Sequence, residues 1–394
     1  MSSPATQKTQ KLKMRAQNKK IKVALVHDYL KEYGGAERVL EALAEIYPQA
    51  PIYTAFCLKN SAAGRAFTDA KIVESHFAPL IKYKNMYSPL RFLTPLIWKS
   101  FNLSQYDLVI TSASWYITRG FRIGPKTKVI CYCHTPPRYL YGYPTSIEWQ
   151  RYLPVRIYGN IIAHFLRLYD YSSAQQVDEF IVNSQNVAAR VKKFYRRSST
   201  VIYPPVEVEK IKEATAGLKP KDYFLIASRL VGAKGIELAA EVAKKAKARI
   251  KIVGEPAGLR WFGGKLKKLE NPYVEFLGRI SDGKLYQLYG QCQAFLALET
   301  DADFGITPVE AMAAGRPVIA FRGGGYLESV VEGKTGLFFD ELTVESLVEV
   351  LKKFKPEKYK PEDCQAQAKK FNKERFKREI REFVETKCRS RSSG

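Results

Sequence analysis

The chain has 394 residues, 46% of them hydrophobic, which is too long for one compact core and enough to build two. Its formal net charge of +25 implies an anionic partner, which could be a nucleic acid, an anionic lipid surface or a phosphorylated molecule. No apolar run reaches the roughly 20 residues of a membrane-spanning helix, and the N-terminus lacks the apolar core of a signal peptide, so we expect a cytoplasmic protein.

The two ends of the chain are basic. Residues 1–22 carry seven Lys or Arg and no acid, so we expect residues 1–20 to form a disordered basic tail. Residues 361–394 combine a charged helix, expected from about Pro361 to Thr386, with a second basic tail, and we expect the helix to pack back on the first domain. The six cysteines show no CxxC pair and no metal-ligand spacing, which favours buried thiols and predicts no metal site.

The first half of the chain alternates apolar strands with segments long enough for helices. From Ile21, the run IKVALVHDY is typical of a strand buried on both faces of a parallel sheet. The turn Gly34-Gly35 follows, and AERVLEALAEIYP then has helical spacing. The further strand candidates are PIYTAF, YDLVITSA, KVICYCH and EFIVNS. We therefore predict a Rossmann-like domain over residues 21–205.

A stiff break at Tyr203-Pro204-Pro205-Val206 precedes a second alternating series over residues 206–360. Its predicted strands are DYFLIASRL, RIKIVG, VEFLG, AFLALE, PVIAF and GLFF, and its predicted helices are IELAAEVAKKAK, LYQLYGQC and TPVEAMAAG. The fold class is therefore α/β, with two doubly wound parallel sheets in series. Ligands of such sheets bind beyond the carboxyl ends of the strands, so the cleft between the domains is the expected site.

Three glycine turns are suited to binding phosphate. Gly34-Gly35 lies between a strand and its helix, where free N–H groups attract anions; a plain tight turn is the alternative. Residues 228–235 place Arg229 and Lys234 around a glycine turn, although both could be solvated surface charges. Gly323-Gly324-Gly325 would let the backbone approach a ligand closely, and a flexible loop is the alternative.

Seven motifs in register resemble the family-4 retaining glycosyltransferases, whose GT-B fold has two Rossmann-like domains facing each other across a cleft. In chain order they are HDYL…GGAERV, HTPPRYLY, IVNSQ, SRL…KG, FLGRIS, FGITPVEAMAAGRPVIA and GGG…E…GKTG. The residues of these motifs are most similar to those of mannosyltransferases that build lipid-linked oligosaccharides and O-antigens. The resemblance implies transfer of a hexose, with mannose favoured, from a nucleotide-diphosphate sugar, with GDP-mannose favoured, to a lipid-linked or membrane-associated glycan. It implies no cofactor and no metal.

The resemblance also implies roles for individual residues. Arg229 and Lys234 would neutralise the donor pyrophosphate, and Glu310 would bind the ribose hydroxyls. Backbone N–H groups at the start of the helix would bind the sugar or phosphate, and those residues are Gly305, Ile306 and Thr307. Gly34 and Gly35 would meet the phosphate from the other domain.

Two further roles complete this set. Gly278-Arg279-Ile280 would line the base pocket, and His134 would reach the transferred sugar. A lone histidine at a strand end is often structural, and this alternative stays open for His134.

Position 302 departs from the family pattern. The signature has a Glu eight residues before Glu310, and this chain has Ala302 there. The interpretation that we favour is a chain inactivated at a catalytic position; the alternative is a lineage that works without this Glu, with Asp301 or Asp303 in its place. On the first interpretation, Ala302→Glu is expected to raise transfer.

Two segments of the first half interleave Lys and Arg with aromatic and aliphatic residues, Ile81–Tyr106 and Arg138–Tyr171. This composition suits a membrane interface, so we expect a peripheral protein on the inner face of the cell membrane; core helices with solvated charges are the alternative. A nucleic-acid-binding protein would share the charge, but no recognition motif appears and nucleic acid is not an expected partner. A non-catalytic nucleotide-sugar-binding protein also stays open because of Ala302.

Overall fold

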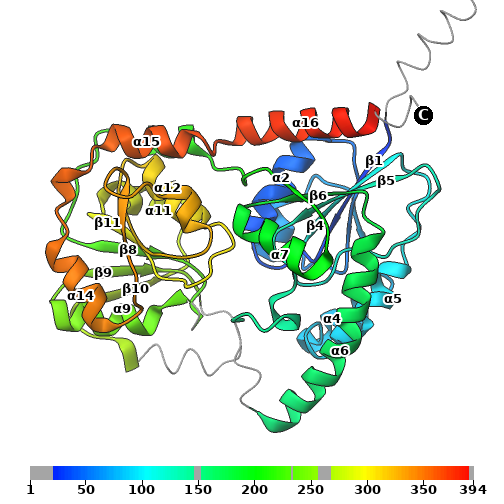
Figure 1. The fold of residues 1–394 in the computed structure, drawn as a ribbon, viewed down its shortest axis with the longest axis horizontal. Coiled ribbons are helices and arrows are strands. Elements are labelled where there is room, and N and C mark those ends of the chain that lie inside the picture. Colours follow the sequence, from blue (N-terminus) through cyan, green and yellow to red (C-terminus); the bar gives the residue numbers. More distant parts are fainter. Residues whose placement is uncertain (1–20, 146–151, 232–233, 256–267, 390–394) are drawn as a thin grey trace, which may run out of the picture.

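The computed structural model describes residues 21–145, 152–231, 234–255 and 268–389 (Figure 1). The predicted basic tail 1–20, and the end of the closing tail from residue 390, lie outside the described residues. The described chain forms two domains side by side, each built on one parallel sheet. The α/β fold class and the two Rossmann-like domains are thereby confirmed.

The first sheet has seven strands in the order β3-β2-β1-β4-β5-β6-β7, all parallel. The central strands are buried along their length, as the continuous apolar runs predict. Their bounds are β1 Val23–His27, β2 Ile52–Thr54, β3 Ile72–Glu74, β4 Leu108–Ala113, β5 Lys128–Cys133, β6 Glu179–Val182 and β7 Thr200–Val201. The main helices around this sheet are α2 Gly35–Ile46, α3 Ala62–Ala66, α4 Ala78–Lys82, α5 Thr94–Lys99, α6 Leu153–Gln175 and α7 Gln185–Tyr195.

The second sheet has six parallel strands in the order β10-β9-β8-β11-β12-β13. In each sheet the strand order changes direction beside the first strand, between β1 and β4 in the first sheet and between β8 and β11 in the second. Ligands of such sheets bind at this topological switch point. The strands are β8 Phe224–Ala227, β9 Ile250–Val253, β10 Val274–Gly278, β11 Ala294–Ala297, β12 Val318–Phe321 and β13 Gly336–Phe339. The helices are α8 Val208–Thr215, α9 Ile236–Ala246, α11 Asp282–Gln291, α12 Ile306–Ala313, α13 Tyr326–Ser329 and α14 Val344–Lys353.

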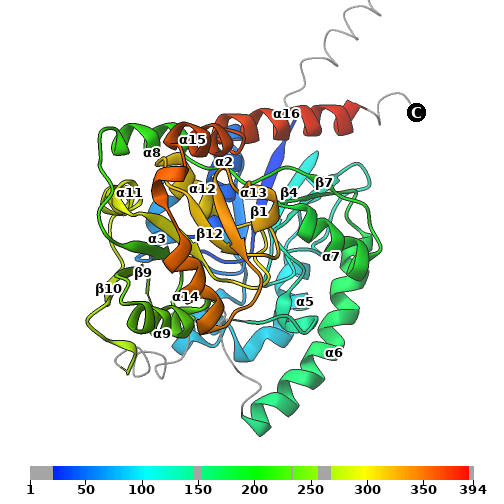
Figure 2. The ribbon, with the colours of Figure 1, turned by 60° about the vertical axis from the view of Figure 1, so that its left-hand side comes forward.

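The end of the described chain holds two helices, where the sequence predicted one. These are α15 Pro361–Lys369 and α16 Lys373–Arg389. The helix breaks because residues 371–373 pair with the interdomain linker: Val206 N–H donates to the Phe371 carbonyl at 3.0 Å, and Lys373 N–H donates to the Val206 carbonyl at 3.0 Å. Helix α15 packs on α12 and α8, whereas α16 packs on α2, so the pair runs across both domains (Figures 1 and 2).

Helix α6 stands apart from the other helices of the first domain. It is 23 residues long, and both views show its N-terminal end projecting away from the sheets (Figures 1 and 2). Within the described part of the chain, no helix is both long and apolar enough to cross a membrane.

Candidate functional site

Two helix N-termini, one from each domain, face each other across the interdomain cleft. Gly35 begins α2, and a Cβ atom added to it would lie 3.0 Å from Ile306 Cδ1 at the start of α12. Gly305 caps α12 with a φ of +91°, and a Cβ there would lie 2.5 Å from the Tyr326 ring, so only glycine fits. The structure thus brings together predicted residues of two motifs. Opposed helix N-termini are suited to an anion lying between them.

Thr307 and Glu310 follow on α12. The Glu310 carboxylate is almost fully buried, and it forms an ion pair with Arg38 of α2 and accepts a hydrogen bond from the Tyr289 hydroxyl at 2.8 Å. Attraction to this carboxylate raises the pKa of Arg38, so the guanidinium group is charged at neutral pH. A ribose that binds Glu310 would have to share it with Arg38. Its role toward ribose stays a prediction.

The two predicted pyrophosphate cations have different surroundings. Arg229 is half exposed, and its guanidinium lies 3.4 Å from the carboxylate of Glu32 in the first domain. Lys234 is less exposed and forms an ion pair with Glu299, a residue that the motif analysis did not single out. Both cations follow β8, at the carboxyl end of the second sheet, where ligands of such sheets bind.

The predicted base-pocket residues lie at the carboxyl end of β10, the edge strand of the same sheet. Gly278 has a φ of +62° and its carbonyl accepts from Gly254 N–H at 2.9 Å, which holds the turn against the end of β9. The guanidinium of Arg279 is half exposed, 3.8 Å from Glu255, and Ile280 packs on the core of the second domain. No contact of these residues distinguishes one base from another.

His134 directly follows β5 and takes part in a chain of hydrogen bonds. His134 Nε2 lies 2.8 Å from Ser112 Oγ, which lies 3.0 Å from His27 Nδ1. His27 Nε2 lies 3.4 Å from Glu37 Oε1, and the other oxygen of Glu37 accepts from Gly34 N–H at 2.8 Å. The chain connects the predicted sugar contact to the predicted phosphate turn.

Burial, together with the nearby His27, lowers the pKa of His134 to about 4. The imidazole is therefore neutral at physiological pH, and it can exchange hydrogen bonds with a sugar hydroxyl without bringing a positive charge beside the anomeric carbon. The sequence analysis missed His27, Ser112 and Glu37 as partners. The signal available was that β1, β4 and β5 are adjacent and end at one edge of the sheet.

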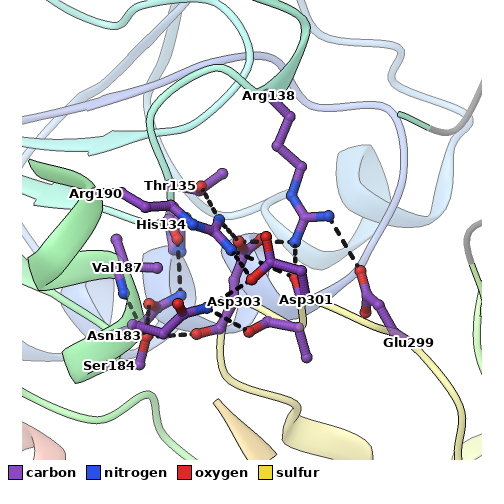
Figure 3. A network of polar contacts seen from close by, with 12 residues as sticks. His134, Thr135, Arg138, Asn183, Ser184, Val187, Arg190, Glu299, Asp301 and Asp303 are labelled. Atoms are coloured by element: carbon purple, nitrogen blue, oxygen red, sulfur yellow. Dashed lines mark hydrogen bonds and ion pairs between the residues drawn. The ribbon is translucent and has the colours of Figure 1, made fainter. Parts of the chain in front are cut away.

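Residues 299–303, which we call the acidic loop, connect β11 to α12 and are held by two arginines of the first domain (Figure 3). Arg190 of α7 pairs with Asp301 and Asp303, both at 2.5 Å. Arg138 pairs with Asp303 at 2.9 Å and with Glu299 at 3.3 Å. Burial alone would raise the pKa of Asp303, but the two arginines outweigh it and lower that pKa, so the Asp303 carboxylate is charged at neutral pH.

Ala302 lies inside this loop and is buried in the core of the second domain. Its carbonyl accepts from Gly325 N–H at 2.8 Å and from Asn186 Nδ2 at 3.0 Å. The triple glycine was predicted to let the backbone approach a ligand, but here it approaches the acidic loop. A Cβ at Gly323 would lie 2.5 Å from the Thr300 carbonyl oxygen, and one at Gly324 would lie 2.5 Å from Ala302 N. These glycines are needed for backbone packing.

The region whose composition suits a membrane interface, and where the resemblance would place the glycan acceptor, has an exposed apolar surface on α6 and around α4–α5. On α6, residues at helical spacing point outward, with Phe165 63% exposed and Leu168 60% exposed. The other exposed apolar residues of this surface are Leu80, Tyr83, Phe92, Leu96, Tyr152, Leu153, Val155, Ile157, Tyr158, Ile161 and Tyr171. Residues 78–99 contain no acid and carry Lys82, Lys84, Arg91 and Lys99.

A search of the described residues for a metal centre is negative: they contain no group of three or more His, Cys, Asp or Glu that could hold a metal ion. Five of the cysteines are buried, namely Cys57, Cys131, Cys133, Cys292 and Cys364.

Two Rossmann-like domains with opposed helix N-termini define the GT-B class of glycosyltransferase fold. The family model "Glycosyl transferases group 1" matches residues 207–371, and the model "Glycosyltransferase Family 4" matches residues 33–210. The chain belongs to the family-4 GT-B glycosyltransferases, as the motifs predicted, and it is a glycosyltransferase.

Individual proteins agree with this assignment. Alpha-1,3/1,6-mannosyltransferase ALG2 of Dictyostelium discoideum is 25% identical over 374 residues, which cover 81% of this chain and 86% of the relative. The protein of the same name from Candida glabrata is 27% identical over 373 residues, 79% of this chain and 78% of the relative. The solved structure of Anabaena Alr3699/HepE in complex with UDP-glucose matches with a TM-score of 0.66 at 18% identity, covering 93% of this chain and all of that chain.

Proposed function

We propose that this glycosyltransferase moves mannose from GDP-mannose to a lipid-linked or membrane-associated glycan, with retention of configuration at the anomeric carbon. The observation that carries the proposal is the pair of opposed helix N-termini at Gly35 and Ile306, with Arg229 and Lys234 at the same cleft. The choice of mannose is supported by the names of the two ALG2 relatives. Guanine is the base that the motif resemblance favours.

The geometry suits departure of a nucleoside diphosphate. As the bond from the anomeric carbon to the pyrophosphate breaks, negative charge grows on the leaving phosphate and positive charge grows on the sugar. Backbone N–H groups at the start of α2 and α12 (Gly35 and residues 305–307), together with Arg229 and Lys234, stabilise the leaving phosphate, whereas the Gly34 N–H donates to Glu37. Neutral His134 contacts the sugar. The acceptor hydroxyl attacks from the side of the departing phosphate, which keeps the configuration, and its proton passes to an oxygen of that phosphate. Two cations in place of a metal ion make the transfer metal-independent.

A membrane-associated acceptor is supported by the exposed apolar surface on α6 and α4–α5. Large apolar side chains exposed on a projecting helix, beside Lys84, Lys99 and Arg156, suit a helix lying in the interface of an anionic membrane. In this orientation the first domain docks on the membrane and the cleft receives a lipid-linked glycan. The proposed location is the inner face of the cell membrane, held peripherally.

A panel of nucleotide sugars tests the donor. A ligand that binds only the folded protein raises its melting temperature, and at equal concentrations the tighter ligand raises it more, so GDP-mannose should give the largest shift, ahead of UDP-glucose and ADP-glucose. The shift should persist in EDTA. A larger shift with UDP-glucose would contradict the base and the sugar, and loss of all shifts in EDTA would contradict the metal-free site.

A non-catalytic nucleotide-sugar-binding protein is the second candidate, because Ala302 stands where the family has Glu. Transfer of radiolabelled mannose from GDP-mannose to a lipid-linked oligosaccharide fraction separates the two. Donor binding without transfer or donor hydrolysis would favour the second candidate.

A further inference from the structure

The three carboxylates of the acidic loop differ in what they touch. Asp301 and Asp303 pair with arginines of the first domain. The Glu299 carboxylate bridges two cations from different domains: one oxygen lies 3.3 Å from Arg138, and the other forms an ion pair with Lys234 (Figure 3 shows Glu299 and Arg138). Glu299 is therefore the carboxylate of this loop that touches a predicted ligand of the donor pyrophosphate.

We propose that Glu299 is a positioning residue of the donor site: its carboxylate holds the Lys234 ammonium group in place for the donor pyrophosphate and joins it to Arg138 of the opposite domain, a role that rests on the proposed transfer function. Glu299 follows the carboxyl end of β11 by two residues and is 8% exposed, so it is placed by the sheet. The Glu that the family usually has would stand at position 302, so Glu299 is a different residue.

The backbone fixes Lys234 relative to Glu299. Gly235, with a φ of +69°, seats the turn against Leu298, since a Cβ on Gly235 would lie 2.7 Å from Leu298 Cβ. Leu298 immediately precedes Glu299. The turn that carries Lys234 is thus packed on the residue before the carboxylate that binds it.

The charges also favour this role. The Glu299 carboxylate lies between the Lys234 ammonium group and the Arg138 guanidinium group, and Arg138 is also paired with Asp303. Without the carboxylate the two cations would repel each other, and the long lysine side chain would lose its single orientation. An ammonium held in place before the donor arrives binds the pyrophosphate with less loss of conformational entropy.

Position 302 does not compete for this role. The Ala302 side chain is buried in the core of the second domain, and Asp301 and Asp303 on either side are engaged by Arg190 and Arg138. A carboxylate that acts on Lys234 from this loop must come from Glu299.

A double-mutant cycle tests the proposal, using Glu299→Gln, Lys234→Ala and the double variant, each assayed for donor Kd and for kcat/KM with GDP-mannose. Glu299→Gln should lower kcat/KM about 10- to 100-fold, the size of a lost charge-assisted contact. In the Lys234→Ala background the same change should cost less than about threefold, because a residue that acts through Lys234 has nothing left to position. Glu345→Gln is the matched control: it breaks the Lys245–Glu345 pair of the same domain, 2.5 Å apart and exposed, and should leave kcat/KM unchanged.

The possible outcomes separate this role from others. Equal losses in both backgrounds would show that Glu299 supports the fold independently of Lys234 and would overturn the proposal, as would a Glu299→Gln variant with wild-type kinetics. If Glu299→Gln melts below the assay temperature, Glu299→Asp replaces it, because it keeps the charge and shortens the reach. A wild-type protein that binds no nucleotide sugar would overturn the proposed function itself, whereas an active wild type with additive losses would overturn only the role of Glu299.

Discussion

Arg229 and Lys234 are the side chains on which donor binding should depend most. Each supplies a charge-assisted contact to pyrophosphate, so replacing either by Ala should cost about 1.5–3 kcal/mol of donor binding. Isothermal titration with GDP-mannose measures the loss. Arg322→Ala is the control, because Arg322 pairs with Glu332 and Asp340 of its own domain. Wild-type affinity in both Arg229→Ala and Lys234→Ala would show that the pyrophosphate lies elsewhere.

His134 should make the fold sensitive to mild acid. Its pKa of about 4 in the folded chain is below the ordinary value of about 6.5, so between these pH values the unfolded chain binds a proton that the folded chain does not. Stability from this group is complete above about pH 6.5 and is lost as the pH falls toward 4. Urea unfolding at pH 7 and pH 5 should show a smaller loss of stability in His134→Gln than in the wild type, by about 1–2 kcal/mol. Parallel curves for the two proteins would contradict a buried neutral imidazole.

The burial of Ala302 leads to an expectation that differs from the one based on the motif. Restoring Glu at 302 was expected to raise transfer, but this position is 1% exposed and packed in the core. A carboxyl group buried there without a partner costs about 1–3 kcal/mol. We therefore expect Ala302→Glu to lower the melting temperature and not to raise transfer. Differential scanning calorimetry and the mannose-transfer assay check the two parts, with Ala302→Ser as a small polar control. A rise in transfer at an unchanged melting temperature would restore the first expectation.

At the scale of elements, α6 makes the clearest prediction. Replacing Phe165 and Leu168 by Ser removes two of its most exposed apolar side chains, and each should weaken the hydrophobic part of membrane binding. Flotation with anionic liposomes should fall about tenfold or more in the double variant, and salt should weaken binding further by screening. Leu327→Ser is the matched control, since Leu327 is 53% exposed on the second domain.

Two results would count against that role of α6. Equal flotation of the wild type with neutral and anionic vesicles would contradict an electrostatic contribution. A wild type that does not float, and whose apparent mass in solution falls when Phe165 and Leu168 are replaced, would assign the surface to a second copy of the chain.

The elements also show what the sequence could predict. Central strands such as β1 and β5 were predictable because burial on both faces leaves continuous apolar runs. The edge strands β3 and β7 were missed because they are short and only partly buried. The split of the last helix was missed because it depends on pairing with Val206, far away in the chain.

Some residues of the site could also be predicted from the sequence, and others could not. Glycine turns and helix starts have local signatures, and the structure brings Gly35 and Ile306 together. Arg38, Arg190 and Glu299 had no such signature, because what makes them part of the site is a partner in the other domain or in another turn. Spacing along one chain does not record which charges meet across a cleft.

At the scale of the whole molecule, the arginine bridges should hold the two domains together. The Arg190 side chain is 4% exposed and pairs with both Asp301 and Asp303, so Arg190→Gln removes the charged partner of Asp301, whereas Asp303 keeps Arg138. Losing a hydrogen bond between charged groups costs about 1.5–3 kcal/mol, which favours separated domains. Small-angle X-ray scattering should show a larger radius of gyration for Arg190→Gln without donor. Arg322→Gln breaks bridges within one domain and should leave the radius unchanged. An unchanged radius in both variants would assign closure to other contacts.

The chain passes between the domains twice, once before α8 and once between α15 and α16, and the two passages are hydrogen-bonded to each other through Val206. A single flexible passage would let the domains swivel and slide in any direction. Two passages bonded side by side leave essentially one freedom, a rotation about the line through them. Atoms near that axis keep the same neighbours during the rotation, whereas atoms on the side of the cleft far from the axis move the greatest distance. Each catalytic cycle is therefore expected to retrace one path, with the same surfaces meeting in the same register at every closure.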